Sequence, residues 1–142
     1  GDIRPSSTGQ RIVDYLSGRE PSYLEGGINF IAVRDVAVGH ILAARRGQPG
    51  RRYILGHAQG NLMRQDFYRL MERVSGVRPP RQRRRSPLHW LRRPAQKGRG
   101  FQPAALTCNP ARAIRELGLP QTPLEEAFAE AVQWFREHGY VR

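Results

Sequence analysis

Few residues in this chain of 142 have the types and spacing that redox catalysis requires. A nicotinamide dinucleotide is usually held by a glycine-rich turn between a strand and a helix, and the sequence contains no such turn. A tyrosine with a lysine four positions later could move a proton during carbonyl reduction. Here the only lysine is Lys97, and Arg93 stands four positions before it. We therefore identify no catalytic residue and no cofactor-binding residue in this sequence.

The histidines, serines and single cysteine do not form a recognisable metal or nucleophile site either. No serine lies in a Gly-x-Ser-x-Gly turn that would activate it. Cys108 has no cysteine or histidine neighbour at metal-ligand spacing, and the four histidines are widely separated, at positions 40, 57, 89 and 138. We expect no metal ion to bind, and we interpret Cys108 as a buried or incidental thiol. A single cysteine also suits a reducing, cytoplasmic location.

The net charge of +12 is concentrated in one segment. Residues 78–100 carry nine basic residues and no acidic one, so the rest of the chain is nearly balanced. This segment lacks sustained apolar periodicity, and we expect a mobile, arginine-rich loop. The alternative is a binding module that uses 78–100 to contact nucleic acid or an anionic surface, with Trp90 stacking on bases. We do not favour a nucleic-acid partner, because the charge lies outside any recognisable recognition fold.

The first half of the chain predicts two helices and three short strands. Ser7 or Thr8 can cap a helix that ends at Gly18. The apolar run from Ile28 to Val33 predicts a buried strand, with a shorter strand at 23–24 before it. Asp35 is the expected N-cap of a helix over 36–46, in which Gly39 permits close packing and His40 faces the core. A second short strand is expected over 52–55.

The second half predicts three more helices, over 62–75, 110–117 and the C-terminal region. The last one is the clearest, because Thr122-Pro-Leu-Glu125 matches a capping box and an apolar stripe follows it. We therefore expect an α/β fold in which short strands are covered by about five helices, forming one domain over residues 1–142. No apolar run is long enough to span a membrane, and no signal peptide is recognised.

The most informative pattern is the segment from Gly27 to His40. A strand enters a helix through Val33-Arg-Asp-Val-Ala37, and Gly39-His40 follow on the first turns. This arrangement resembles the C-terminal half of extended short-chain dehydrogenases/reductases, the NAD-dependent epimerase/dehydratase family. Four further blocks in family order look like those of hopanoid-associated sugar epimerases and dihydroflavonol-4-reductase-like proteins: residues 2–9, 52–56, 112–118 and 134–140.

The resemblance implies that this chain is the C-terminal, substrate-binding part of a Rossmann-type, NAD(P)-dependent epimerase or reductase. It implies that an N-terminal half, which binds the dinucleotide and supplies the catalytic groups, is absent, and we expect this chain to be inactive alone. The chain opens in a turn-like stretch at Gly1 that suggests a cut inside a larger protein.

The family's substrate is a small molecule, sugar-like or flavonoid-like, and the loops over it would place four polar side chains around the pocket: Arg4, Thr8, Tyr23 and Asn29. Nucleotide-sugar epimerases have an arginine where this chain has Ile28, and often a histidine where it has Ala32. A nucleotide-diphosphate sugar is therefore not the expected substrate.

Overall fold

The computed structural model describes residues 4–80 and 104–141. The described residues form four α-helices, one short π-helix and a two-stranded antiparallel sheet. This agrees with the predicted class of short strands covered by about five helices. The prediction of a mobile loop over 78–100, and Trp90 with it, falls almost wholly outside the described residues.

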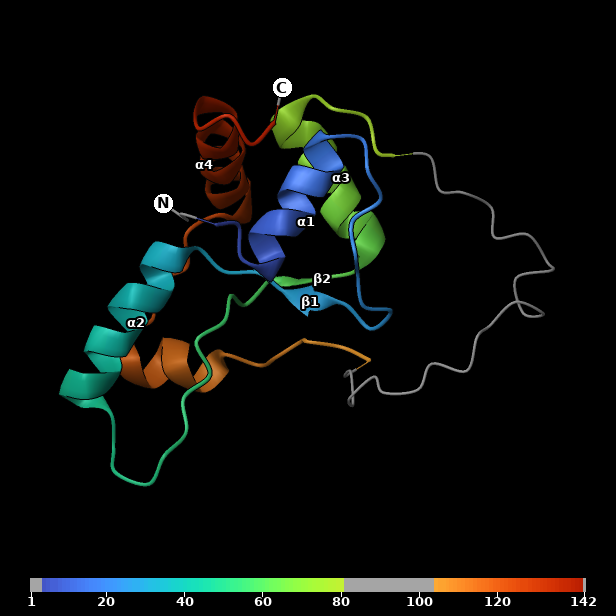
Figure 1. Cartoon of the computed structure of the whole chain (residues 1–142). Coiled ribbons are helices and arrows are strands. Elements are labelled where there is room, and N and C mark those ends of the chain that lie inside the picture. Colours follow the sequence, from blue (N-terminus) through green and yellow to red (C-terminus); the bar gives the residue numbers. More distant parts are fainter. Residues whose placement is uncertain (1–3, 81–103, 142) are drawn as a thin grey trace, which may run out of the picture.

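Three helices and the strand pair enclose the larger apolar core. Helices α1 (Ser7–Leu16), α3 (Arg64–Ser75) and α4 (Leu124–Glu137) gather on one side of β1 (Ile28–Asn29) and β2 (Asn61–Leu62) (Figure 1). Phe67 is fully buried at the centre, and its ring contacts Tyr15, Phe30 and Phe128 at centroid distances of 5.6 to 6.0 Å. Aromatic pairs at such distances add specific contacts to the burial of apolar area.

A second, smaller apolar cluster lies on the other side of the strand pair. It joins α2 (Val33–Arg46) to the π-helix η2 (Ala113–Leu117) (Figure 1). Gly39 of α2 packs so closely that an added Cβ would lie 2.7 Å from Leu119 Cδ1. The predicted close packing at Gly39 is therefore confirmed.

The strands are much shorter than predicted. The expected strand over 28–33 is reduced to Ile28–Asn29, where Ile28 pairs with Leu62 and Asn29 with Asn61. A single parallel bridge joins Ile28 to Leu106 on the other side. The predicted strands over 23–24 and 52–55 are wrong. Residues 52–55 make no backbone hydrogen bond with another described residue, and an extended segment becomes a strand only when a neighbour pairs with it.

Helix α2 begins earlier than predicted, which changes the roles of Asp35 and His40. Its N-cap is Ala32, so Asp35 lies in the first turn and not at the cap. His40 is exposed rather than inward-facing, and its Nδ1 lies 2.8 Å from the Val36 carbonyl. Asp35 and Gly39 occupy the buried face of α2. Each residue of a helix is rotated by about 100° from the one before it, so His40, which follows Gly39, points away from that face.

Two other helix caps also differ from the prediction. Ser6, one residue before the predicted cap, accepts a hydrogen bond from the Gly9 N–H at 3.2 Å and caps α1. Thr122 is not the N-cap of α4, because that helix begins at Leu124 after Pro123 and has no side-chain cap. The predicted capping box at Thr122 is therefore wrong.

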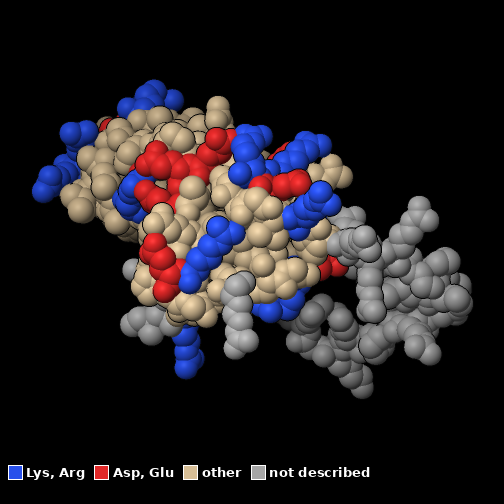
Figure 2. Space-filling view, turned by 90° about the horizontal axis from the view of Figure 1, so that it is seen from above, with Lys and Arg blue, Asp and Glu red and all other residues tan. Residues whose placement is uncertain are grey.

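Thr122 instead joins the start of α4 to α2. Its N–H and its hydroxyl donate to the two carboxylate oxygens of Asp35, at 2.7 and 2.9 Å. The Asp35 residue is only 3% exposed, so these bonds satisfy a buried charge that would otherwise be costly. Arg34 adds exposed ion pairs to Glu126 and Glu130 of α4. On the face seen in Figure 2, acidic and basic side chains are intermixed.

No helix within residues 4–80 and 104–141 has the length and apolar character needed to cross a membrane.

The Asp35–Thr122 contact predicts a specific pattern of stability. Thr122→Ala should lower the free energy of unfolding by about 1–2 kcal/mol, because it leaves one oxygen of a buried carboxylate without a donor. Thr122→Ser keeps the hydroxyl and should remain close to the parent chain. Urea unfolding of both variants, repeated in an Asp35→Asn background, measures the coupling between the two residues. An equal loss from Thr122→Ala in both backgrounds would contradict this explanation.

Candidate functional site

Two neighbouring open pockets lie beside η2, and they share Asn109 and Ala111. The first has a volume of about 520 Å³, and its remaining lining residues are Ala58, Asn61, Cys108, Pro110 and Ile114. The second has a volume of about 670 Å³, and its remaining lining residues are Arg52, Ile54, Arg112 and Arg115. Both volumes fall in the range of small-molecule sites.

Two asparagine side chains hold the wall of the first pocket. Asn29 Nδ2 donates to the His57 carbonyl at 3.0 Å and to Asn61 Oδ1 at 2.7 Å, while Asn29 Oδ1 accepts from the His57 N–H at 3.0 Å. Asn61 then donates to the Cys108 carbonyl at 2.9 Å and accepts from the Cys108 N–H at 3.1 Å. The two amides thus connect three chain segments that are distant in sequence.

This wall leaves no room for side chains at two glycines. A Cβ on Gly56 would lie 2.5 Å from Cys108 Sγ, and one on Gly60 would lie 2.2 Å from the Phe30 carbonyl oxygen. Both distances are far below van der Waals contact, so these positions require glycine for the close approach of the segments. The pocket wall is therefore rigidly packed at its base.

The ionisable groups near the first pocket are poorly suited to covalent chemistry. Burial raises the pKa of the half-buried Cys108 thiol, which favours the unreactive protonated form. Burial lowers the pKa of His57, with the charge of Asp35 opposing the shift, and His57 Nδ1 accepts a hydrogen bond from the Gln59 N–H at 3.1 Å. Among the described residues, no three histidine, cysteine or carboxylate side chains are grouped to hold a metal ion.

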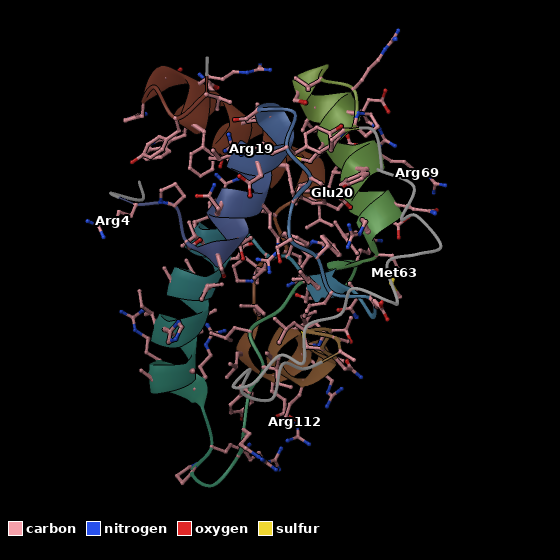
Figure 3. All side chains as sticks on the ribbon, turned by 45° about the vertical axis from the view of Figure 1, so that its right-hand side comes forward. Arg4, Arg19, Glu20, Met63, Arg69 and Arg112 are labelled. Carbon is pink, nitrogen blue, oxygen red and sulfur yellow. The ribbon has the colours of Figure 1, made fainter. Side chains whose placement is uncertain are left out.

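The structure separates the four side chains that were predicted to surround a substrate. Asn29 does not line the first pocket, but its side chain donates a hydrogen bond to Asn61, which does. Tyr23 is buried in the aromatic core, where its hydroxyl donates to the Leu62 carbonyl at 2.8 Å and burial raises its pKa. Thr8 is half-buried on α1, and Arg4 is exposed at a part of the surface well away from Arg112 (Figure 3). Their role in substrate binding stays a prediction.

Sequence reasoning did not identify the residues that line the pockets. Asn61 had no predicted role, although it stands directly opposite Asn29 in the strand pair. Asn109 lies shortly before η2, where its Oδ1 accepts a hydrogen bond from the Ala111 N–H at 3.0 Å. The pairing of Asn29 with Asn61 depends on contacts between distant segments, which local patterns do not report.

Comparison with known proteins finds similarity over nearly the whole chain. A Synechocystis sp. protein named as a dihydroflavonol 4-reductase is 36% identical over 99% of this chain and 46% of its own length. Sterol demethylase protein B of Methylococcus capsulatus is 32% identical over 99% of this chain and 47% of its own length. The chain thus spans about half the length of the curated relatives it matches. No protein-family model matches the sequence.

Two solved structures share the fold. The crystal structure of gox2253 matches 99% of this chain with a TM-score of 0.73 and 34% identity, over 47% of that structure. WbmF of Bordetella bronchiseptica, solved in complex with NAD⁺ and UDP, matches 94% of this chain with a TM-score of 0.59. At 22% identity, over 36% of its length, the WbmF match shows the fold alone.

The hydrogen bonds of Asn29 predict a large loss of stability when its side-chain amide is removed. Asn29→Ala should lower the free energy of unfolding by about 2–3 kcal/mol, because it removes three hydrogen bonds and leaves the buried His57 N–H unpaired, although the His57 carbonyl keeps its bond from the Gly60 N–H. Chemical denaturation measures this loss, and the exposed Gln59→Ala variant, next to the same segment, is the control. A loss no larger than that of the control would show that the network does not hold the pocket wall.

Proposed function

We propose that this chain, which resembles the C-terminal part of extended short-chain dehydrogenases/reductases, is the substrate-binding portion of an NAD(P)-dependent sugar epimerase or reductase-like oxidoreductase. The observation that carries the proposal is the 36% and 32% identity, over 99% of this chain, to a dihydroflavonol 4-reductase and a sterol demethylase protein. The order of the sequence blocks and the fold shared with gox2253 support the same family. The relatives do not favour the alternative of a nucleic-acid-binding module.

In this proposal the cofactor binds to a dinucleotide-binding half outside this chain. The pyrophosphate of a dinucleotide requires backbone N–H groups at a glycine-rich start of a helix. The helices α1 to α4 of the described part begin without a glycine-rich turn. The NAD⁺ bound in the WbmF structure supports NAD as the cofactor of the larger protein.

The substrate of the larger protein is a small, sugar-like or flavonoid-like molecule in this proposal. The first pocket beside η2 has a suitable volume and offers the one Asn61 amide N–H that the network leaves unused, together with apolar surface from Ile114. Polar groups that fix orientation within an otherwise apolar lining are typical of such sites. A cytoplasmic location is part of the same proposal, since the single cysteine of the chain, Cys108, suits a reducing compartment.

The exposed face of α2 is the surface on which we place the dinucleotide-binding half. Val33, Val38 and Ile41 are 84%, 42% and 53% exposed, and Val38 and Ile41 lie three residues apart on one side of the helix. Large apolar side chains grouped on a surface mark interaction sites in proteins that otherwise bury them. Packing of a second domain would remove these three side chains from water.

The cofactor proposal is tested by titrating the purified chain with NADH and following Trp134 fluorescence. We expect no saturable change for this chain alone, because it offers no site for the pyrophosphate. When the dinucleotide-binding half is co-expressed, saturable binding and substrate turnover should appear together. Saturable micromolar binding by the chain alone would contradict the proposal.

Co-purification of the co-expressed halves tests the surface that joins them. Ile41→Asp places a charge in the proposed interface and should abolish co-purification of the halves, because a buried unpaired charge is costly. Met63→Asp is the matched control, since Met63 is 50% exposed but lies at the start of α3, away from α2. Equal loss of co-purification in both variants would place the interface elsewhere.

A further inference from the structure

We propose that the second pocket binds the phosphate group of a small phosphorylated molecule between Arg52, Arg112 and Arg115. These three arginines line one open pocket of about 670 Å³ and come from two separate segments, the extended stretch after α2 and the start of η2. The site consists of residues of this chain alone, so it does not depend on the proposed cofactor or on the dinucleotide-binding half.

The positive charge of the arginines in this pocket is largely unpaired. Arg52 and Arg112 form no ion pair with another described residue, and Arg115 has only a 3.4 Å contact with the neighbouring Glu116. The Glu116 carboxylate is already occupied by Arg51 Nη1, at 3.1 and 3.2 Å, and by the Tyr53 hydroxyl at 3.1 Å. One carboxylate therefore faces several guanidinium groups, and the pocket retains a net positive charge.

The charge of Glu116 offsets part of this positive charge without cancelling it. Burial alone would raise the pKa of Glu116, but the Tyr53 hydrogen bond and the charges of Arg51 and Arg112 outweigh that effect, so the pKa is lowered. Glu116 is thus ionised at neutral pH and accepts hydrogen bonds from Arg51, Tyr53 and Arg115, while Arg112 acts on it only through its charge. An anion between Arg52 and Arg112 would meet donors that have no protein acceptor among the described residues.

The shape of the pocket favours a small phosphate ester over a simple ion. Arginine offers two parallel N–H donors that match phosphate oxygens, and charge-assisted bonds of this kind are the strongest in proteins. The exposed Ile54 side chain and Ala111 supply apolar surface next to the arginines. Asn109 and Ala111 also line the first pocket, so an uncharged organic part can extend from the phosphate toward Asn61.

Figure 3 shows where this site lies in the molecule. Arg112 projects from the region of η2, far from the labelled residues Arg19, Glu20 and Arg69 around α1 and α3. The acidic partners of those arginines, Asp14 and Asp66, lie in the same distant region. The arginine pocket is therefore set apart from the ion pairs that Arg19 and Arg69 form around α1 and α3.

Calorimetric titration of the full 142-residue chain with inorganic phosphate, and separately with glucose 1-phosphate, tests this site at a fixed ionic strength. We expect saturable binding of both, with the sugar phosphate binding more tightly because it also fills the first pocket. Acetate serves as the comparison anion and should bind far more weakly. Binding of acetate as tight as that of phosphate would overturn the assignment to phosphate.

Arginine variants distinguish a defined phosphate site from a general attraction of anions to the positively charged surface. Arg112→Gln and Arg52→Gln should each weaken phosphate binding about tenfold through loss of charge-assisted hydrogen bonds. Arg45→Gln removes the same charge from the exposed end of α2, outside the pocket, and should change affinity less than about twofold, as expected for a screened surface charge. Because all three positions are exposed, circular dichroism melting should show unchanged folding. Equal weakening by Arg45→Gln and Arg112→Gln, or a linear response without saturation, would overturn the proposal.

Discussion

The fold depends on side-chain amides that hold together segments whose backbones barely pair. The only sheet of the described part has two residues in each strand, which is too little to fix the register of three chain segments by itself. Asn29 and Asn61 bind each other and the backbones of His57 and Cys108, and so extend the strand pair with side-chain hydrogen bonds. The first pocket exists because these amides fix its wall, while Gly56 and Gly60 allow the segments to approach.

Local patterns predicted the helices well and the contacts between segments poorly. The apolar stripes of α1, α3 and α4 face the aromatic core, because a helix needs only its own periodicity to define a buried face. For Thr122, the local sequence pattern predicted the wrong contact. Its sequence context matches a capping box, but a buried carboxylate 87 residues earlier in the chain accepts its hydroxyl instead. Likewise, the exposed position of His40 follows from where α2 begins, and the arginine pocket joins residues that are about sixty positions apart.

The two apolar clusters differ in how completely this chain covers them. The cluster of α1, α3 and α4 buries its large aromatic side chains, with Tyr15, Phe67 and Met71 fully enclosed. The cluster of α2 and η2 buries only Ala113, Leu117 and Leu119 fully, while Val38 and Ile41 remain on the surface. Both pockets lie at this second cluster. The proposed function accounts for the difference, because a dinucleotide-binding half would cover α2 and place the cofactor close to the substrate-side portion.

This difference in coverage is measured most directly by amide hydrogen exchange of the 142-residue chain, residue by residue. Helices with few buried apolar contacts open at a lower free energy than those in a complete core. We predict that the amides of α2 exchange through openings well below the global unfolding free energy, while those of α3 exchange only with global unfolding. Adding the dinucleotide-binding half should then protect α2. Protection of α2 as strong as that of α3 in the chain alone would contradict the claim that a second domain covers the exposed face of α2.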